Sequence, residues 1–345
     1  MKNNHNKSHN FFLFSGLLVL VVISFSGCNS NTNEASTDQL VAEMNRHVET
    51  ITLAEAEDDV IPRFNQSKTI ACIKAEFRVH GDIPGDLQQG IFSKPAVYPA
   101  MLRFANATNM DDSKKDIRGL SIKIRNVDGS ILWGEPGVQD FLLNSYPALF
   151  VATPEDFLSF IRARQDDKKF RFFLSPFDPH LKSLWIVINA RKKHLSSLDI
   201  RYWSTVPFRL GESDGHVVKY SVIPCSSYTT TKAVNAGKNQ LRAAMKSHLR
   251  KEPVCFHFAV QKQTDSVTMP IEDASVIWSE RDSPFQTVAT ITIRNQDFDN
   301  PQSLATCEQS SFNPWQSLTT HKPLGRMNEV RRLVYENAAK LRNRE

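Results

Sequence analysis

Short apolar runs recur along the chain and are separated by Gly, Pro or Asp, a pattern typical of β-strands. Two of the runs, 254–260 and 287–293, alternate apolar with polar residues, as half-buried antiparallel strands do. The pattern therefore predicts a mostly antiparallel sheet. The predicted strands are 72–79, 100–104, 120–124, 140–143, 219–223, 254–260 and 287–293.

Apolar residues at helical spacing predict several helices around this sheet. Residues 39–57 place Leu40, Met44, Val48 and Ile51 on one side, so a helix is expected to open the domain. No internal repeat and no long linker interrupts the rest of the chain. We therefore expect an α+β fold, an antiparallel β-barrel with inserted and appended helices. The other predicted helices are 154–164, 233–250 and 327–342.

Composition agrees with an ordinary globular protein. The 345 residues include 41% hydrophobic and 23% charged residues, which excludes a collagen, a coiled coil and a wholly disordered chain. The formal net charge is +5, and it falls to +3, 40 basic against 37 acidic residues, without Lys2 and Lys7. Such a surplus is too small to indicate a nucleic-acid partner.

The amino terminus has the pattern of a secretory signal peptide. Two lysines precede an apolar run at residues 11–25, which is shorter than the roughly 20 residues that span a bilayer. Ser26-Gly27-Cys28 follows and resembles the bacterial lipobox, in which Cys28 becomes the lipidated first residue. The alternative is cleavage elsewhere, with Cys28 as a plain thiol. We expect an exported lipoprotein held at a cell membrane or outer membrane, with a signal peptide (1–27), a polar tether (28–38) and one domain (39–345).

Four cysteines remain, and their spacing does not fit a metal site. No two of them are separated by two residues, so a zinc site is not expected. An exported chain permits two disulfides, but four cysteines allow three pairings. Isolated buried thiols are an equal alternative, and the sequence does not choose between them. The residues are Cys72, Cys225, Cys255 and Cys307.

The last predicted helix carries a tyrosine between arginines. Positions four and seven apart share one helix face, so Arg331, Tyr335 and Arg342 point together. The span from Tyr335 to Arg342 is about 10 Å. A guanidinium one turn away favours the phenolate form of a tyrosine, which is a hard ligand for ferric iron. Arg342 can then reach an anionic group at the rim of a flat macrocycle.

This helix and the residues before it resemble the heme catalases. Residues 307–314, Cys-Glu-Gln-Ser-Ser-Phe-Asn-Pro, are similar to the Glu-Gln-x-x-Phe-x-Pro stretch that precedes the proximal helix of that family. The resemblance implies heme b as cofactor, Tyr335 as its proximal iron ligand, and roles at the heme for Arg331 and Arg342. It also implies a catalase-like barrel that binds heme, in a minimal relative of the family.

Two further segments resemble the same family. Phe77-Arg78-Val79-His80 is similar to a strand that ends in Val-His, which implies that His80 is the distal histidine and that Val79 lies above the heme. Residues 103–106 and 116–123 resemble the Arg-Phe-Ser and Asp-Pro-Arg-Gly segments. They imply a propionate contact for Arg103 and a structural or propionate-side role for Arg118. Ala105 stands where catalases have a serine.

A fourth segment completes the resemblance. Asn144 and Phe157 have the spacing of the family's distal asparagine and of the phenylalanine that packs on the heme. Taken singly, each of these residues is better explained as a strand-end histidine, a solvated arginine, a turn asparagine or a core phenylalanine, and only their order and combination favour the resemblance. The match runs from about Cys72 to Arg344, and residues 166–219 stay unaligned.

The resemblance implies peroxide chemistry. An imidazole takes and returns a proton near neutral pH, and an amide orients a peroxide without titrating. The first hypothesis is a heme enzyme at the cell envelope that consumes hydrogen peroxide or an organic hydroperoxide. The alternatives are a lipid-hydroperoxide peroxidase or isomerase, and a non-enzymatic heme-binding lipoprotein. A homo-oligomer is compatible with each of them.

Overall fold

The computed structural model describes residues 36–343 except residue 59. The predicted signal peptide, Cys28 and residues 28–35 of the predicted tether lie outside the described residues. None of the described helices is long and apolar enough to cross a membrane.

The first described helix, α1 (Thr37–Ala54), begins two residues before the predicted start of the helix at residue 39 and ends three residues before its predicted end at residue 57. Ser36 is the reason for the early start, because it forms a capping box with Gln39. The Ser36 side chain accepts from the backbone N–H of Gln39, and the Gln39 side chain accepts from the backbone N–H of Ser36. The domain therefore starts with an ordered helix cap at Ser36.

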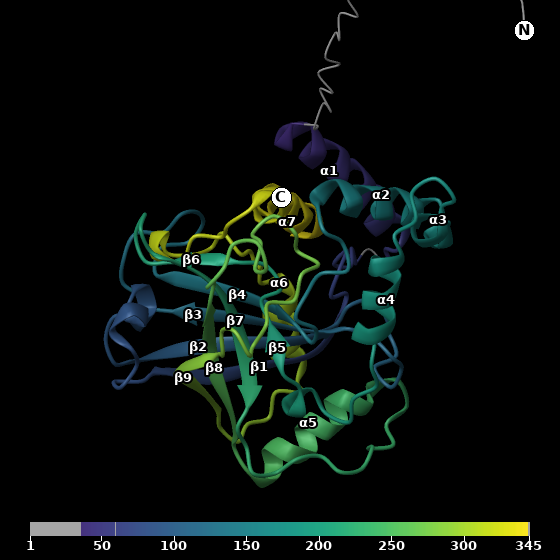
Figure 1. The fold of residues 1–345 in the computed structure, drawn as a ribbon. Coiled ribbons are helices and arrows are strands. Elements are labelled where there is room, and N and C mark those ends of the chain that lie inside the picture. Colours follow the sequence, from purple (N-terminus) through teal and green to yellow (C-terminus); the bar gives the residue numbers. More distant parts are fainter. Residues whose placement is uncertain (1–35, 59, 344–345) are drawn as a thin grey trace, which may run out of the picture. The chain divides into compact units, whose positions relative to one another are not determined.

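Antiparallel strands form one continuous sheet in the described part of the chain (Figure 1). Each predicted strand lies within an observed strand, and most of the observed strands are longer. The strands are β1 (Lys68–Val79), β2 (Ala96–Asn106), β3 (Arg118–Arg125), β4 (Val138–Asn144), β5 (Tyr202–Trp203), β6 (Phe208–Leu210), β7 (His216–Pro224), β8 (Val254–Lys262) and β9 (Gln286–Ile293).

The sheet closes into a barrel through its shortest strand. The order is β5-β4-β3-β2-β1-β9-β8-β7-β6, and β5 also pairs with β7. Trp203 of β5 pairs with Asn144 of β4 on one side and with Ser221 of β7 on the other. Eight strands therefore form a closed ring, which confirms the predicted α+β barrel. Because β5 has only two residues, it has no alternating pattern from which it could be predicted.

Aromatic side chains fill the barrel. Phe141 contacts Phe258 and Tyr220 at ring-centroid distances of 4.8 and 5.0 Å. His321 is buried among them and accepts or donates a 2.9 Å hydrogen bond at the Tyr220 hydroxyl. Burial lowers the pKa of His321 to about 3, so this imidazole stays neutral.

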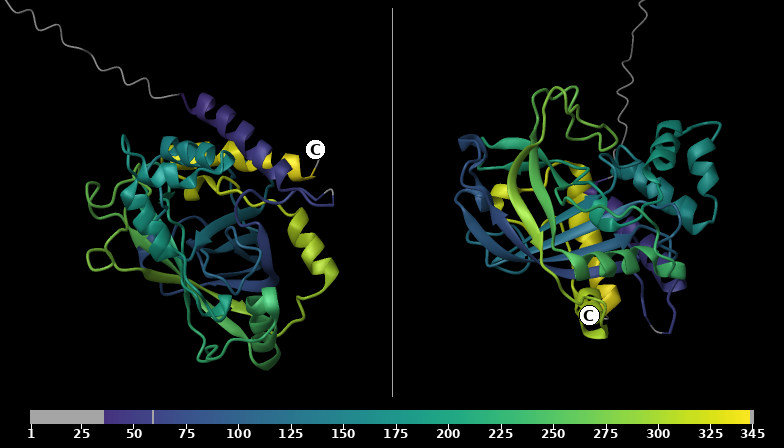
Figure 2. Two further views of the ribbon diagram at one scale, coloured as in Figure 1. Left: turned by 90° about the vertical axis from the view of Figure 1, so that its right-hand side faces the viewer. Right: turned by 90° about the horizontal axis from the view of Figure 1, so that it is seen from below.

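Helices cover one end and one side of the barrel. Figure 2 shows α1 and α7 side by side above the barrel, and the two helices are in contact. The predicted helix 233–250 begins only at Gln240, because Gly237 has a φ of +55° in the polar stretch before it. The other helices are α2 (Pro154–Gln165), α3 (Lys169–Leu174), α4 (Leu181–Ala190), α5 (Gln240–Lys251), α6 (Pro301–Gln309) and α7 (Arg326–Asn343).

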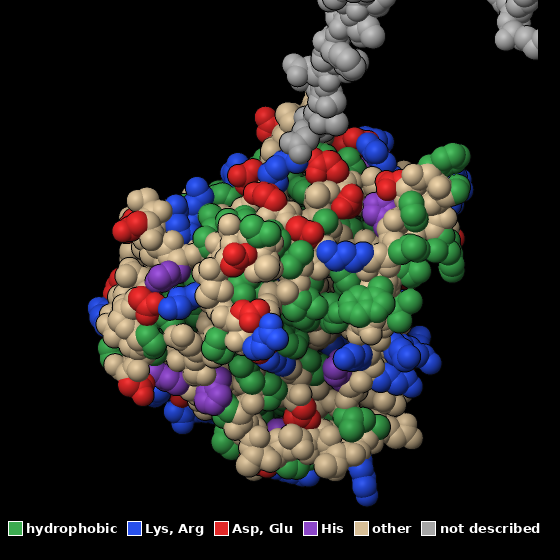
Figure 3. Space-filling model, in the orientation of Figure 1, with side chains coloured by type: hydrophobic (Ala, Val, Ile, Leu, Met, Phe, Trp, Pro, Cys, Tyr) green, Lys and Arg blue, Asp and Glu red, His purple; other side chains and the backbone are tan. Residues whose placement is uncertain are grey.

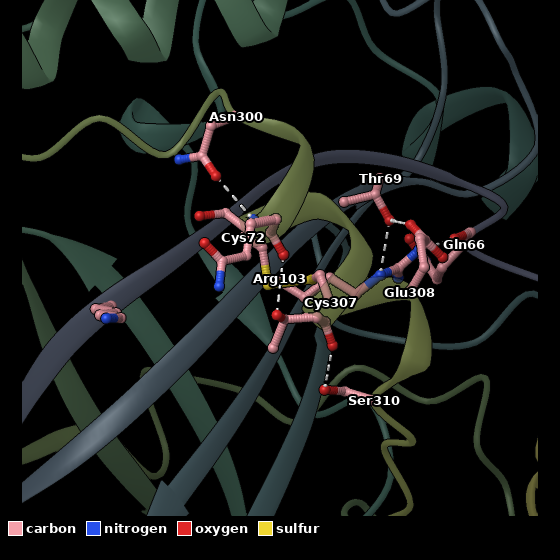
Figure 4. The surroundings of a disulfide bond; sticks show 12 residues. Gln66, Thr69, Cys72, Arg103, Asn300, Cys307, Glu308 and Ser310 are labelled. Atoms are coloured by element: carbon pink, nitrogen blue, oxygen red, sulfur yellow. Dashed lines mark hydrogen bonds between the residues drawn. A yellow bond between two sulfur atoms is a disulfide. The ribbon is translucent and has the colours of Figure 1, made fainter.

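Two disulfides resolve the pairing that the sequence left open. Cys72 of β1 bonds Cys307 of α6, and Cys225 bonds Cys255 of β8. The first bond ties α6 to the barrel wall across 235 residues of sequence. Thr69, Arg103 and Glu308, which belong to the candidate site described next, lie around this disulfide (Figure 4).

Candidate functional site

Tyr335 lies on α7 beside an arginine from the preceding turn. Nη2 of Arg331 donates a 3.4 Å hydrogen bond to the phenolic oxygen, and its guanidinium carbon lies 5.2 Å from the centre of the tyrosine ring. Nη1 of the same arginine donates to Oδ1 of Asn328 at 3.1 Å, which holds the guanidinium in place. The helix face predicted from the sequence is therefore present, with Tyr335 half-buried.

Two turns further along α7, Arg342 joins a group of arginines in which Arg103 is buried and the other two are half-buried. We call Arg63, Arg103 and Arg342 the arginine cluster. Arg63 donates from Nη2 to the backbone carbonyls of Cys307, Glu308 and Ser310, at the end of α6. Arg342 donates to the same Ser310 carbonyl at 3.4 Å.

Arg103 comes from the wall of the barrel. It is 2% exposed and donates from Nε to the hydroxyl of Thr69 at 2.9 Å. Its Nη2 donates to the backbone carbonyl of Gln66 at 2.6 Å. Figure 4 shows Arg103, Thr69 and Glu308 gathered next to the disulfide that anchors α6. The barrel, α6 and α7 thus each contribute to one buried site.

The guanidinium groups of the arginine cluster lie close enough to change one another's pKa. Burial, followed by the charges of Arg103 and Arg342, lowers the pKa of Arg63 to about 8. Burial lowers the pKa of Arg103 to about 10, with Arg342 acting in the same direction and Glu308 opposing it. Glu308 hydrogen bonds with Thr69, and its Oε2 lies 3.5 Å from Nε of Arg63. Because a guanidinium keeps its proton in proteins, a buried group of this kind favours a bound anion.

Gln66 precedes β1 and faces Asn144. Its backbone has a φ of +59°, a strained conformation for a residue other than glycine, and its carbonyl is held by Arg103. Its Nε2 donates a 3.1 Å hydrogen bond to Oδ1 of Asn144. Gly119 of β3 permits this approach, because a Cβ there would lie only 2.1 Å from Oε1 of Gln66. Oε1 itself is buried and has no hydrogen-bond partner among the described residues.

The structure does not bring His80 to this site. Thr69, Ala105, Gly119 and Asn144 form one row across four strands, at the start of β1. His80 follows the other end of β1, after Val79, and ten strand residues from Thr69 extend about 33 Å. There its Nε2 lies 2.7 Å from the hydroxyl of Thr290. The predicted pairing of His80 and Val79 with Asn144 around one cofactor is therefore not met.

Arg118 and Phe157 have separate surroundings. Arg118 is fully buried and hydrogen bonds with Asn106 and with the carbonyls of Asp112 and Lys114, which braces the β2–β3 loop. Of its two predicted roles the structural one fits these contacts. Phe157 of α2 is half-buried and packs against Phe150, with 6.3 Å between ring centres.

Comparison with known proteins gives a likeness in fold and none in sequence. No family model matches the chain, and no curated protein matches it. A fungal catalase superposes with a TM-score of 0.67 at 15% identity, over 83% of this chain and 60% of its own. The chain has a catalase-like fold. Catalase A from Saccharomyces cerevisiae superposes with a TM-score of 0.66 at 16% identity, over 83% of this chain and 62% of its own. A bacterial catalase superposes with a TM-score of 0.64 at 16% identity, over 92% of this chain and 62% of its own.

These identities show the catalase-like fold alone. The chain also spans only about 60% of the length of these catalases, so their activity does not transfer with the fold. Within the fold, however, the donor set fits a heme. Tyr335 supplies a phenol on one helix, and the arginine cluster supplies cations for the two carboxylates of that cofactor.

Sequence reasoning missed Arg63, Gln66 and Glu308 at this site. A signal for the first two was present. Arg103 lies near the carboxyl end of β2. Because β1 runs antiparallel to β2, the amino end of β1 lies at the same edge of the sheet as Arg103. Residues just before β1 were therefore the place to look, and Arg63-Phe64-Asn65-Gln66 stands there.

Proposed function

We propose that this chain binds heme, and that Tyr335 would ligate the iron while the arginine cluster would hold the carboxylates of the cofactor. One observation carries the proposal. Arg342, two turns beyond Tyr335 on α7, lies close enough to Arg63 and Arg103 for its charge to lower the pKa of both, and it contacts the end of α6 at the Ser310 carbonyl. Bound heme supplies an iron centre able to bind and reduce oxygen species.

The chain's own residues would then hold the cofactor and orient a small ligand. Arg331 donates to the phenolic oxygen of Tyr335 and thereby stabilises negative charge on it. On the barrel side, the amides of Gln66 and Asn144 can donate and accept hydrogen bonds, which suits the orientation of a small ligand. Neither amide exchanges a proton near neutral pH. Arg103 and Gly119 fix the position of Gln66.

This arrangement gives stronger support to heme binding than to rapid cleavage of a peroxide. General acid–base help is worth roughly 10²–10⁴ in rate, and the imidazole expected to provide it lies at the other end of β1. A heme enzyme that consumes hydrogen peroxide or an organic hydroperoxide is the second candidate. The catalase-like fold favours it, and Asn144 is available to orient a peroxide.

Heme titration of the purified full chain tests the proposal. We expect stoichiometric, saturable binding with the absorption spectrum of a tyrosinate-ligated ferric heme. Tyr335→Phe removes only the phenolic oxygen, so the fold should persist while affinity falls and the spectrum changes. Peroxide turnover on the same loaded sample separates the two candidates. Binding that does not saturate, or an identical spectrum in Tyr335→Phe, would refute the axial assignment.

We also infer from the sequence that the chain is exported and held at a membrane by a lipid on Cys28. The support is the apolar run at 11–25 followed by Ser26-Gly27-Cys28. Heme binding does not depend on this inference.

A further inference from the structure

Exposed apolar side chains gather on α3, α4 and the turn between them. We call this set the α3–α4 patch. Phe177, in the turn, is 96% exposed, and Phe170 of α3 is 78% exposed. Exposed single apolar residues are common, but a contiguous group marks an interaction surface. The members are Phe170, Leu174, Phe177, Leu181, Trp185 and Ile188.

Helix α4 shows that this exposure is organised. Ser183, Ile186 and Ala190 form a buried stripe against the rest of the domain. Leu181, Trp185 and Ile188 follow at positions i, i+4 and i+7, so they form a second stripe that faces solvent. A helix with apolar residues on both faces has one face that the domain itself does not cover.

Positive charge surrounds the patch. Residues 166–195 contain seven lysines and arginines and three aspartates, so the segment carries a net charge of +4 by this count. All seven basic side chains are exposed, as are the three aspartates. Figure 3 shows hydrophobic side chains along the side of the molecule that carries α3 and α4, with Lys and Arg side chains beside them. The basic residues are Lys168, Lys169, Arg171, Lys182, Arg191, Lys192 and Lys193.

Several of these cations have no acidic partner in the part of the chain that the structure describes. Among the described residues, no carboxylate lies within 4.0 Å of the side-chain nitrogens of Lys168, Lys169 or Lys192, whereas Lys182 lies 3.6 Å from Asp273. Cations of this kind are available to an external anionic surface. The charge pattern therefore selects among the possible occupants of the patch.

A second copy of the chain is disfavoured by this charge. In a two-fold dimer the same surface meets itself, so the cations of one copy would face those of the other. An anionic bilayer complements them, and its interfacial region accepts exposed Phe, Leu and Ile side chains while Trp prefers the level of the headgroups.

We propose that the α3–α4 patch docks on a lipid bilayer that contains anionic headgroups. The apolar side chains enter the interface, and the surrounding lysines and arginines contact the headgroup phosphates. This contact belongs to the described domain, so it is separate from any lipid on Cys28, and it does not rest on heme binding.

Fluorescence quenching at Trp185 tests the proposal on the full chain. Quenching reports the position of this side chain, so membrane association through residues 11–25 does not produce the signal. We expect vesicles of brominated phosphatidylglycerol and phosphatidylcholine to quench a component of the emission that is absent from Trp185→Phe. Vesicles of brominated phosphatidylcholine alone should quench it less, because the anionic headgroups are missing.

Two matched variants complete the experiment. Phe177→Ser should abolish most of the Trp185 quenching, whereas Val267→Ser, which removes another exposed apolar side chain at 84% exposure, should leave it unchanged. Far-ultraviolet circular dichroism establishes that each variant is folded. Unquenched Trp185 on vesicle-bound protein overturns the proposal. It is also overturned if Phe177→Ser converts an oligomer to a monomer without vesicles, because a second copy would then cover the patch.

Discussion

The side-chain amide of Gln66 donates a 3.1 Å hydrogen bond to the side-chain oxygen of Asn144. This pair joins the segment before β1 to the end of β4, at the edge of the barrel where Arg103 also lies. Two amides at this position can orient a ligand, but they do not titrate. The proposed heme site thus has hydrogen-bonding capacity on its barrel side without an acid–base group from this pair.

Replacing Gln66 with histidine should add an acid–base group beside Asn144. We expect Gln66→His to raise the rate of hydrogen peroxide cleavage by the heme-loaded protein, by up to roughly 10²–10⁴-fold, because an imidazole would then adjoin Asn144. Oxygen release and peroxide loss measure the effect. His80→Ala is the control and should leave the rate unchanged, since His80 contacts Thr290 at the far end of β1. A loss of activity in His80→Ala would contradict this assignment.

Arg342 should contribute to heme affinity through charge. Charge-assisted hydrogen bonds contribute about 1.5–3 kcal/mol, so Arg342→Gln should weaken heme binding about tenfold to a hundredfold. Lys340→Gln, on an exposed part of the same helix, removes a cation that pairs with Glu336 and should have little effect. Heme titration measures both variants. Equal affinities in the two variants would show that the arginine cluster does not hold the cofactor.

Lys219 should make stability depend on pH. Burial lowers its pKa to about 7, against the opposing charge of Asp273, and its ammonium group lies 4.8 Å from the centre of the Trp278 ring. In the unfolded chain the Lys219 side chain keeps its proton up to about pH 10.4, whereas in the folded chain it loses that proton near pH 7. The free energy of unfolding therefore gains from this group as the pH rises from about 7 to 10.

Replacing Lys219 with methionine removes this pH-dependent contribution. We expect Lys219→Met to raise the unfolding temperature relative to the wild type at pH 6, and the difference to shrink as the pH rises towards 10. Thermal unfolding followed by circular dichroism measures it. Lys94→Met, at a mostly exposed position, should change little at either pH. A difference that stays constant with pH would contradict the prediction.

The two disulfides should contribute unequally. The chain-entropy relation gives about 5.5 kcal/mol for the 235-residue separation of Cys72 and Cys307, and about 3.6 kcal/mol for the 30-residue separation of Cys225 and Cys255. The double variant Cys72→Ser/Cys307→Ser should therefore unfold at a lower temperature than Cys225→Ser/Cys255→Ser.

Only the first pair should also weaken heme binding, because it anchors α6, whose end contacts Arg63 and Arg342. Thermal unfolding and heme titration of both double variants, each under oxidising conditions, check the two statements separately. An equal loss of heme affinity in both double variants would contradict the role of α6.

Cys28→Ala tests the predicted anchor. If Cys28 carries a lipid, the variant should leave the membrane fraction or accumulate as an unprocessed precursor. Fractionation and the mass of the mature chain measure this outcome. Unchanged processing and fractionation would remove the lipoprotein inference and leave the α3–α4 proposal standing, because that proposal is read at Trp185.

The barrel could be predicted from the sequence because its long strands carry short apolar runs separated by Gly, Pro or Asp, and β8 and β9 also alternate apolar with polar residues. Strand β5 could not, since two residues have no period, and it forms only because β4 and β7 lie on either side of it. Lys68 and Thr69 at the start of β1 are polar, so the pattern placed the beginning of this strand too late, at Cys72.

The site was predictable where one helix carries it. Arg331, Tyr335 and Arg342 lie on α7, and helical spacing alone fixes their common face. The barrel side depends on strand direction instead. Val79 and His80 match the Val-His motif in sequence. The register of β1 against β2 is needed to show that the other end of β1 lies beside Arg103.

Asn144 also takes part in closing the barrel, because among the described strands β4 is joined to β7 only through the two residues of β5. Its backbone pairs with Trp203, and β5 joins the two halves of the wall through that pair and two others. Such a seam is where local opening and amide hydrogen exchange begin, because few backbone hydrogen bonds must break. A ligand held by the Asn144 side chain would slow this opening. Exchange protection at 202–203 would thus report occupancy from the barrel wall itself.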